Sequence, residues 1–441
     1  MFHEAGLIAI AVVGLAALLC GMAMTWLRQP AIVGYIIAGV LLGPSVLGIV
    51  AERENITLLA DIGVLLLLFL IGMELSLKSF MRVWKVAIGC MALQVAGALG
   101  FNFLLATILG WSPAAAMVGG FVMALSSTAV AIKILEDIGE LDSDTGRLTI
   151  AVLIAQDLAV VPMMLIVRNM GGGTNSDGGG LGWVGAAQIG FAVVFLVGFL
   201  VVLARKGTVR LPFIERIAGN ADLRALAALA LCLGAATLSG VLGLSPAYGA
   251  FLAGVLIGNS NVSAAMEQAT QPIQSILMMV FFLSIGLLID LGFIWDNIGA
   301  VALWLVVVTL FKTALNIGIL RALGIPWNQA FVSGTVMGQI GEFSFVIAGT
   351  AFAAGLVTAE GQRMAVAIIA LSLVVSPLWQ VMARRLDDAA AVGITSFREI
   401  LRALVTPGET PSIAKVAAAA GEGLQRRREE RDGSNGVGGA A

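Results

Sequence analysis

Gly146–Val167 reads GRLTIAVLIAQDLAVVPMMLIV, a run of 22 mostly apolar residues with a Gln–Asp pair, Gln156 and Asp157, near its centre. About 20 apolar residues in a helix cross the hydrocarbon core of a bilayer. A carboxylate at the middle of such a helix costs about 2.5–3.5 kcal/mol on insertion scales, and intramembrane acids are usually functional for that reason. We therefore expect Asp157 to bind a ligand; a buried structural ion pair is the alternative.

The composition of the chain is that of a membrane protein. Of its 441 residues, 59% are hydrophobic and 12% are charged, whereas soluble domains have about 25% charged residues. The net charge of −2 gives no indication of nucleic-acid binding, and the three cysteines lie in apolar runs without metal-ligand spacing. No nucleophile–base pair or cofactor motif is present, so we predict neither an enzyme nor a bound cofactor or metal.

Long apolar runs predict an all-α polytopic membrane protein with about 13 transmembrane helices. Loops after the odd-numbered spans hold thirteen Lys and Arg residues, and the opposite loops hold three. The positive-inside rule therefore predicts that the N-terminus lies outside and the C-terminus in the cytoplasm, and we expect the protein in the bacterial inner membrane. The predicted spans are 6–26, 31–49, 57–75, 84–109, 113–135, 146–168, 182–204, 222–242, 246–258, 272–289, 299–321, 327–355 and 361–383.

An internal repeat recurs at an offset near 215 residues. Ala38–Ser45 (AGVLLGPS) matches Ala253–Ser260 (AGVLIGNS), and Ser372 stands where Asp157 would recur. The offset equals seven spans, an odd number, so the two halves cross the membrane in opposite senses, as in secondary transporters. We predict a transmembrane domain over 1–385, with repeat halves at about 6–168 and 222–383 joined by a linker helix at 182–204. Residues 386–441 would form a short, partly disordered cytoplasmic tail.

Two of the predicted spans contain helix-breaking sequence. The fifth holds the hydroxyl residues Ser126, Ser127 and Thr128, which can bond freed backbone groups or simply bond back to their own helix. The repeat offset carries Ser126 onto Gly341, within the sequence Gly338–Glu342 (GQIGE) of span 12. Glycines beside polar groups at membrane depth indicate a discontinuous helix. We therefore predict two broken helices that meet near the midplane, with Gly338 and Gly341 at the second break.

The charges predicted at mid-membrane are Asp157, Glu342 and Lys312. A lysine can offset one carboxylate, which leaves one negative charge for a cation or a proton. We expect Lys312 to hold one of the acids, and Glu342 to tie the broken helix. Burial raises and a nearby lysine lowers a carboxyl's affinity for protons, so a proton and a cation can compete for one site near neutral pH. Such competition at an alternately exposed site produces antiport.

Five stretches then carry a family resemblance: LSSTAVAIKIL, AQDLAVVPMM, VFFLSIGLLID, VTLFKTAL and MGQIGEFSFVI. In this order they resemble the monovalent cation:proton antiporter-2 family, most closely the membrane domain of Kef-type potassium efflux antiporters. The Gln–Asp pair, SPAYGAFL (245–252) and the short tail also resemble the MagA-type iron transporters of magnetotactic bacteria.

The resemblance implies a sodium/proton antiporter-like fold, usually homodimeric. Asp157 would bind cation and proton, together with Gln156, Ser126, Ser127 and Thr128, while Lys312 would be the basic partner. Gln156, in place of a first acid, implies electroneutral exchange. Kef systems carry a regulatory nucleotide-binding domain after the last helix, but this tail lacks a GxGxxG motif followed by a helix. We therefore expect no such domain in this chain and no glutathione- or nucleotide-dependent gating.

These observations predict a proton-coupled monovalent cation antiporter with alternating access, for K⁺ first and Na⁺ next. A ferrous iron/proton transporter of the MagA type is an alternative reading. The remaining alternatives are a cation channel and a sodium-coupled organic-anion symporter on a similar fold. A channel would need no exchange of protons at Asp157, and an organic-anion carrier would need a larger substrate cavity.

Overall fold

The computed structural model describes residues 4–391 apart from 28, 50–53, 75–76, 172–182, 213–214, 216–219 and 243. The chain divides into two compact units, Met1–Ser376 and Pro377–Ala441, and the described part of the second is the end of α17. Most of the predicted tail, from 392 onward, lies outside the described residues. The helices are α1 (Glu4–Trp26), α2 (Ala31–Leu42), α3 (Glu54–Glu74), α4 (Leu77–Leu109), α5 (Pro113–Ala124), α6 (Thr128–Asp137), α7 (Asp144–Gly171), α8 (Trp183–Lys206), α10 (Ala221–Val241), α11 (Pro246–Gly258), α12 (Ser263–Leu288), α13 (Leu291–Asp296), α14 (Ile298–Ala322), α15 (Trp327–Val336), α16 (Phe343–Ala353) and α17 (Ala359–Ala391).

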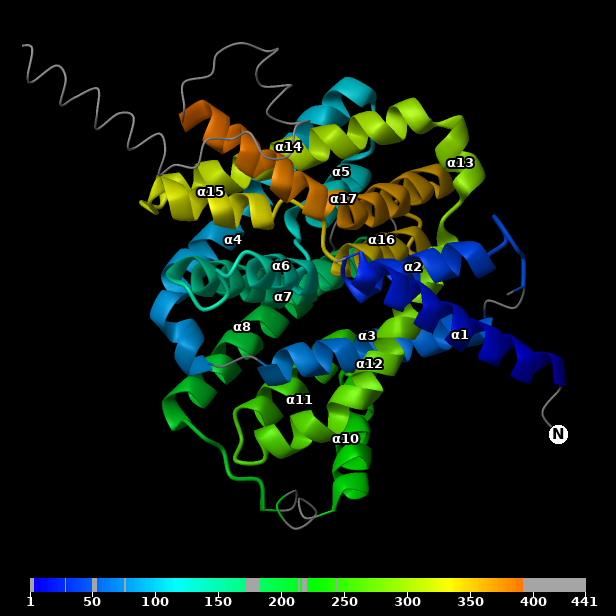
Figure 1. Cartoon of the computed structure of the whole chain (residues 1–441). Helices are drawn as coiled ribbons and strands as arrows, with labels where there is room; N and C mark the ends of the chain where they lie inside the picture. The colour runs from blue at the N-terminus through cyan, green and yellow to red at the C-terminus, as the bar shows by residue number, and fades with distance from the viewer. Residues whose placement is uncertain are drawn as a thin grey trace, which may run out of the picture. The chain divides into compact units, whose positions relative to one another are not determined.

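Each predicted span coincides with one helix, or with two helices separated by a break (Figure 1). Span 5 is α5 and α6, and span 12 is α15 and α16, so the prediction of two discontinuous helices is confirmed. Four boundaries differ from the prediction by seven residues or more. α2 already ends at Leu42 rather than at 49, α4 begins at Leu77 rather than at 84, α12 begins at Ser263 rather than at 272, and α17 ends at Ala391 rather than at 383. The short helix α13, which links α12 to α14, was not predicted because six residues are too few to show a hydrophobic period.

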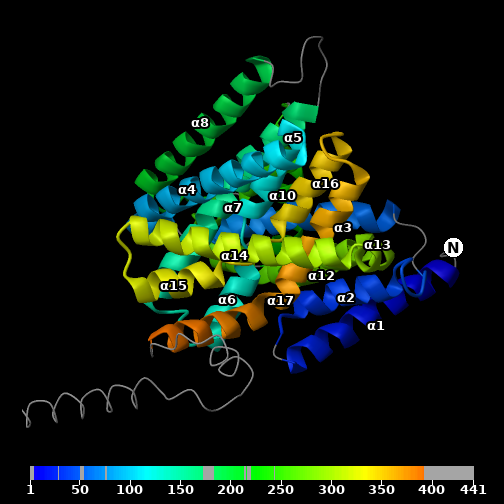
Figure 2. The same cartoon turned by 90° about the horizontal axis from the view of Figure 1, so that it is seen from above.

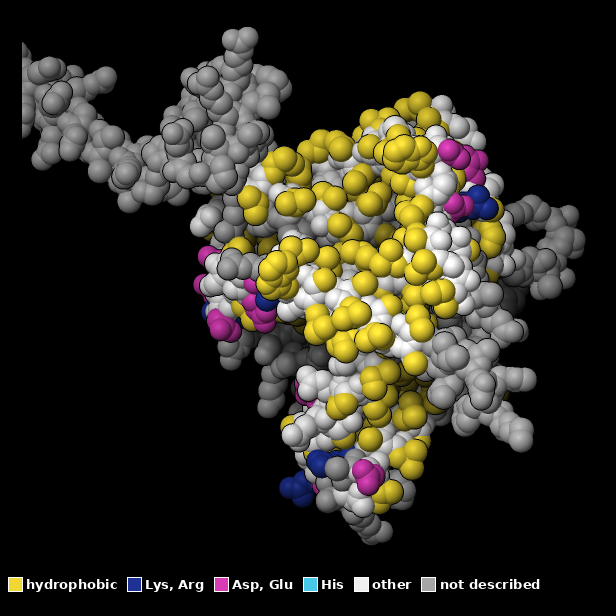
Figure 3. Space-filling model, turned by 45° about the vertical axis from the view of Figure 1, so that its right-hand side comes forward, with side chains coloured by type: hydrophobic (Ala, Val, Ile, Leu, Met, Phe, Trp, Pro, Cys, Tyr) yellow, Lys and Arg dark blue, Asp and Glu magenta, His cyan; other side chains and the backbone are white. Residues whose placement is uncertain are grey.

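The surface of the described residues suits a bilayer. Seven of the described helices are long and apolar enough to cross a membrane, and shorter apolar helices such as α2 and α11 accompany them. Figure 3 shows a face covered largely by apolar side chains, with acidic and basic side chains near its edges. Soluble monomers rarely expose so much contiguous apolar surface. Exposed large apolar residues include Leu104 and Ile108 on α4 and Leu303, Val306 and Leu310 on α14.

The helices of the first unit pack in two groups (Figures 1 and 2). One group contains α1, α2, α3, α10, α11 and α12, and the other contains α4, α5, α6, α7, α14, α15 and α16. The repeated AGVL motif serves packing within the first group. Gly39 abuts the backbone of α12 at Leu283, and Gly254 abuts the backbone of α3 at Phe69. Small residues permit this close helix contact in membranes.

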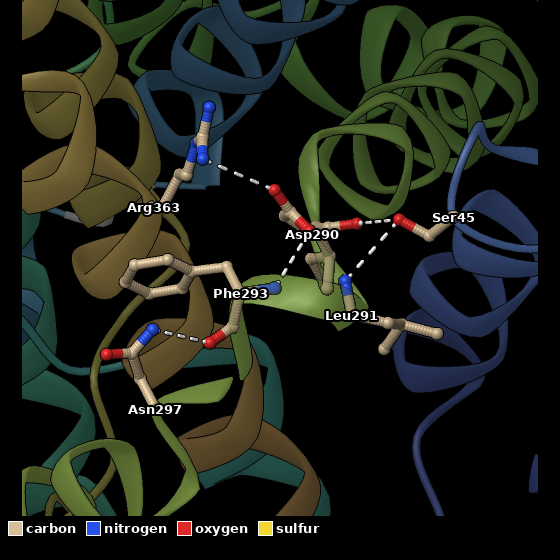
Figure 4. A network of polar contacts seen from close by, with 7 residues as sticks. Ser45, Asp290, Leu291, Phe293, Asn297 and Arg363 are labelled. Atoms are coloured by element: carbon tan, nitrogen blue, oxygen red, sulfur yellow. Dashed lines mark hydrogen bonds and ion pairs between the residues drawn. The ribbon is translucent and has the colours of Figure 1, made fainter. Parts of the chain in front are cut away.

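A polar network joins the α12–α13 turn to two other segments (Figure 4). Asp290 caps α13 by accepting a hydrogen bond from Phe293 N at 3.0 Å, and its other oxygen lies 3.5 Å from the Arg363 guanidinium on α17. The Ser45 hydroxyl, after α2, donates to Ile289 O at 3.0 Å. The Asp290–Arg363 pair links this turn to α17, whereas the ion pairs of Lys133 and Arg147 each lie within one helix, three or four residues apart.

Candidate functional site

The two helix breaks contact each other directly inside the second group of helices. After α5 ends at Ala124, the Leu125 carbonyl accepts a hydrogen bond from Gly341 N at 3.0 Å. The Ser126 hydroxyl donates to Met337 O at 3.0 Å. A β-carbon at Gly341 would lie 2.7 Å from the Ser126 carbonyl oxygen, well inside van der Waals contact. Glycine at this position is therefore required by the close approach of the two chains.

The ends of the four half-helices face groups of the complementary sign. The Lys312 ammonium on α14 contacts the Leu125 carbonyl at the negative C-terminal end of α5. At the C-terminal end of α15, the Asn316 amide donates to Met337 O at 3.0 Å. Asp157 lies at the positive N-terminal end of α6, and Glu342 directly precedes α16. Broken helices expose such partial charges at membrane depth, and these side chains offset them.

Asp157 is 3% exposed and accepts a hydrogen bond from the Thr128 hydroxyl at 2.9 Å. Thr128 is the first residue of α6, and the Ser127 hydroxyl caps that helix by accepting from Val130 N at 3.3 Å. A helix terminus contributes up to about 2 kcal/mol to a nearby charge, and a membrane hydrogen bond contributes about 0.6 kcal/mol. Together they nearly offset the insertion cost of about 2.5–3.5 kcal/mol. The carboxylate is thus tolerated in place.

Gln156, beside Asp157, belongs to a chain of buried amides. Its oxygen accepts from Ser126 N at 2.8 Å, and its amide nitrogen donates to Gln94 Oε1 on α4, also at 2.8 Å. Gln94 donates in turn to Asn316 Oδ1 on α14 at 2.9 Å. Since Asn316 also bonds Met337 O, the chain runs from one helix break to the other. It fixes α4, α7 and α14 around the crossing.

Glu342 and Gln339 lie in the second break, and both contact Ser127. Gln339 Nε2 donates to Ser127 O at 3.1 Å, and the Glu342 carboxylate lies near the Ser127 hydroxyl. Glu342 is 5% exposed, and within the described part of the chain its Oε2 has no hydrogen-bond partner. Glu342 therefore lies beside Ser127 of the first break, and its role as a tie between the broken helices stays a prediction.

The structure brings most of the predicted site residues together at the crossing. Thr128 touches Asp157, and Lys312 binds the Leu125 carbonyl. Ser126 bonds Gln156 on α7 through its amide and Met337 in the second break through its hydroxyl. Sequence reasoning missed Gln94 and Asn316. Each is a polar amide within an apolar helix, which is itself a signal of a buried hydrogen bond, but their partners are not visible in one dimension. Within the described residues, no three His, Cys, Asp or Glu residues gather as a metal site would require.

The comparison with protein families identifies the family of the chain. The transmembrane sodium/hydrogen exchanger family matches residues 14–381. The chain belongs to that family. Members of the sodium/hydrogen exchanger family are transporters rather than enzymes, and the chain is an integral membrane protein of the cation/proton antiporter type. The predicted fold class and family resemblance are thereby confirmed.

Three relatives place this exchanger more closely. It is 47% identical over 433 residues to the iron transporter MagA of Paramagnetospirillum magneticum, a match covering 98% of each chain. It is 32% identical over 384 residues to the glutathione-regulated potassium-efflux protein KefC of Escherichia coli, covering 87% of this chain and 61% of KefC. The structure of the sodium proton antiporter MjNhaP1 from Methanocaldococcus jannaschii superposes with a TM-score of 0.64 at 15% identity, covering 86% of this chain and 98% of that one.

Proposed function

We propose that the protein exchanges a monovalent cation for a proton at Asp157, with K⁺ as the first candidate ion and Na⁺ as the second. The observation that carries the proposal is the buried Asp157 carboxylate, bonded to Thr128 where two broken helices meet. Carboxylate, hydroxyl and carbonyl oxygens suit hard cations. The similarity to the potassium-efflux protein KefC supports potassium over sodium.

Competition for one carboxylate explains the coupling. A proton on Asp157 removes the charge that a cation needs, and a bound cation removes the acceptor that a proton needs. If the site faces each side of the membrane in turn, neither species crosses without being traded for the other. Acidification on both sides should therefore weaken apparent cation affinity in proportion to proton concentration.

The exchange should be electroneutral, with one proton traded for each monovalent cation. Gln156 occupies the position next to Asp157 and carries no charge, and its amide is engaged with Ser126 and Gln94. Only Asp157 therefore changes occupancy at this point of α7. Collapse of the membrane potential with an ionophore should leave the exchange rate unchanged, whereas a marked change would contradict one-for-one exchange.

A ferrous iron/proton transporter is the second candidate, because the MagA relative matches 98% of the chain at 47% identity. The oxygen ligands around Asp157 can also bind Fe²⁺, so the identity of the ion needs a direct measurement. We propose, in addition, a homodimer in the bacterial inner membrane, with the N-terminus outside and the C-terminus cytoplasmic.

The test is cation-driven proton flux in proteoliposomes, measured separately with K⁺, Na⁺ and Fe²⁺. K⁺ and then Na⁺ should dissipate an imposed pH gradient, and Asp157→Asn should abolish that flux while the protein inserts and folds. Asp144→Asn is the matched control, since Asp144 lies on the same helix with a side chain 80% exposed. Full exchange by Asp157→Asn would refute the mechanism, and flux with Fe²⁺ alone would select the second candidate. Cation flow without proton movement would indicate a channel.

A further inference from the structure

A cavity of about 590 Å³ lies apart from the Asp157 site, between α4, α5, α14 and α17. Its mouth is formed by exposed residues of two turns, including Trp111 after α4 and Thr358 and Glu360 at the start of α17. Its floor is buried and includes Val122 at the end of α5 and Ile340 in the second helix break. The cavity therefore runs from the ends of the helices to the crossing of the broken helices, and Asp157 is not among its lining residues.

The size and lining of the cavity suit an organic molecule better than a bare ion. Small-molecule sites enclose about 300–1,000 Å³ and combine apolar walls with a few polar groups. Here the walls are mostly apolar, and the polar side chains are Asn102, Ser112, Thr358 and Glu360. A dehydrated K⁺ or Na⁺ would find few oxygen ligands against such walls. An apolar molecular body would fill them by burying its surface.

The charge around the mouth favours a cation. Glu360 is the only charged residue that lines the cavity, and it makes no ion pair with any described residue. Arg363, one turn further along α17, is engaged with Asp290 at 3.5 Å. Trp111 and Trp304 also line the cavity, with ring centroids 5.5 Å apart. The negative faces of indole rings attract organic ammonium groups.

We propose that this cavity binds an amphipathic organic monocation, with the apolar body against α5 and α14 and the cationic head near Glu360 and the tryptophans. An occupant would touch both α5 and the second break, so it would restrain the crossing without entering the Asp157 site. Binding itself does not depend on the proposed cation exchange. It can therefore be tested without a transport assay.

The experiment measures binding of radiolabelled benzyltrimethylammonium to the full chain in lipid nanodiscs, with empty nanodiscs as the partition background. We expect saturable binding at one site per chain. Glu360→Gln should weaken the binding affinity about fivefold, which is the effect of losing one attraction between two unit charges in water. The neutral carbon isostere neopentylbenzene should compete at least about fivefold more weakly than unlabelled cation for the same reason. Asp222→Asn, an exposed acid on α10 outside the cavity, should leave the affinity unchanged.

Two further variants test the location. Ala115→Phe fills the cavity from α5, and Thr358→Trp narrows its exposed mouth should Ala115→Phe fail to fold. Either folded variant should lose saturable binding. The proposal is overturned if the wild type shows no saturable binding, if the neutral isostere competes as well as the cation, or if Glu360→Gln or a folded cavity variant binds normally.

Discussion

Replacing Gln94 by leucine tests whether the buried amide chain holds the site together. The side chain is 1% exposed and bonds Gln156 at 2.8 Å and Asn316 at 2.9 Å. Hydrogen bonds between membrane helices contribute about 0.6 kcal/mol on average and up to about 1.7 kcal/mol. Loss of both bonds should therefore cost between about 1 and about 3 kcal/mol of unfolding free energy.

In this variant the exchange rate should fall by more than the loss of folded protein explains. Without Gln94, the Gln156 amide loses its acceptor and can rotate away from Ser126 N, to which it now bonds at 2.8 Å. Ser126 positions the backbone of the first break against Met337, so the ion site would lose part of its preorganisation. We expect cation-driven proton flux to drop in Gln94→Leu even in liposomes where the folded fraction equals that of the wild type.

The assay is reversible unfolding in mixed micelles combined with flux in proteoliposomes. Gln271→Leu is the matched control, since Gln271 lies exposed on α12. Gln94→Leu combined with Asn316→Leu should lose less stability than the sum of the single variants, because both remove the same hydrogen bond. Wild-type stability in Gln94→Leu, or strict additivity in the double variant, would refute the reasoning.

Three further predictions concern the crossing itself. Gly341→Ala should lower the unfolding free energy by about 1–3 kcal/mol and suppress exchange, because its β-carbon would meet the Ser126 carbonyl. Gly349→Ala, where the β-carbon would meet open space, should change the unfolding free energy by about 1 kcal/mol or less. Thermal unfolding and flux measure both effects, and equal behaviour of the two variants would contradict the prediction. Thr128→Val should weaken the apparent cation affinity about tenfold or more, because it removes the 2.9 Å hydrogen bond to Asp157. The affinity is measured as the KM for the cation, and an unchanged KM would argue against the prediction. Ser372→Ala should lower the unfolding free energy by about 1 kcal/mol, because Ile340 N loses its acceptor, but the variant should retain exchange. Abolished flux in the folded variant would contradict a purely structural role for Ser372.

Much of this fold follows from one-dimensional patterns. Apolar length places the helices, and the hydroxyls after Leu125 and the glycines around Gln339 mark where two of them break. Asp157 could be predicted as a site residue because a carboxylate in the middle of a membrane helix is energetically costly and is usually functional. Its contact with Thr128 adds geometry to that inference.

The rest depends on which helices become neighbours. The Gln94–Asn316 bond joins residues of α4 and α14 that are far apart in sequence, and no local period predicts that pairing. The same is true of the contact between Lys312 and the Leu125 carbonyl. Charge balance, which pairs Lys312 with an acid, is visible in a sequence, and that pairing stays a prediction. A free carbonyl at the end of a broken helix becomes visible only in three dimensions.

The predicted internal repeat suggests an asymmetry between the two halves of the chain at this crossing. By the predicted repeat offset Asp157 corresponds to Ser372, and each contacts the helix break of its own half. Asp157 bonds Thr128 beside the first break, and Ser372 accepts from Ile340 N in the second. The scaffold therefore offers two matching sites for a side chain that faces a broken helix. A hydroxyl satisfies the backbone without carrying charge, whereas a carboxylate can hold either a proton or a cation. With the carboxylate in one half only, a single charge at this pair of positions is available for exchange, and the electroneutral exchange that we propose follows from that asymmetry.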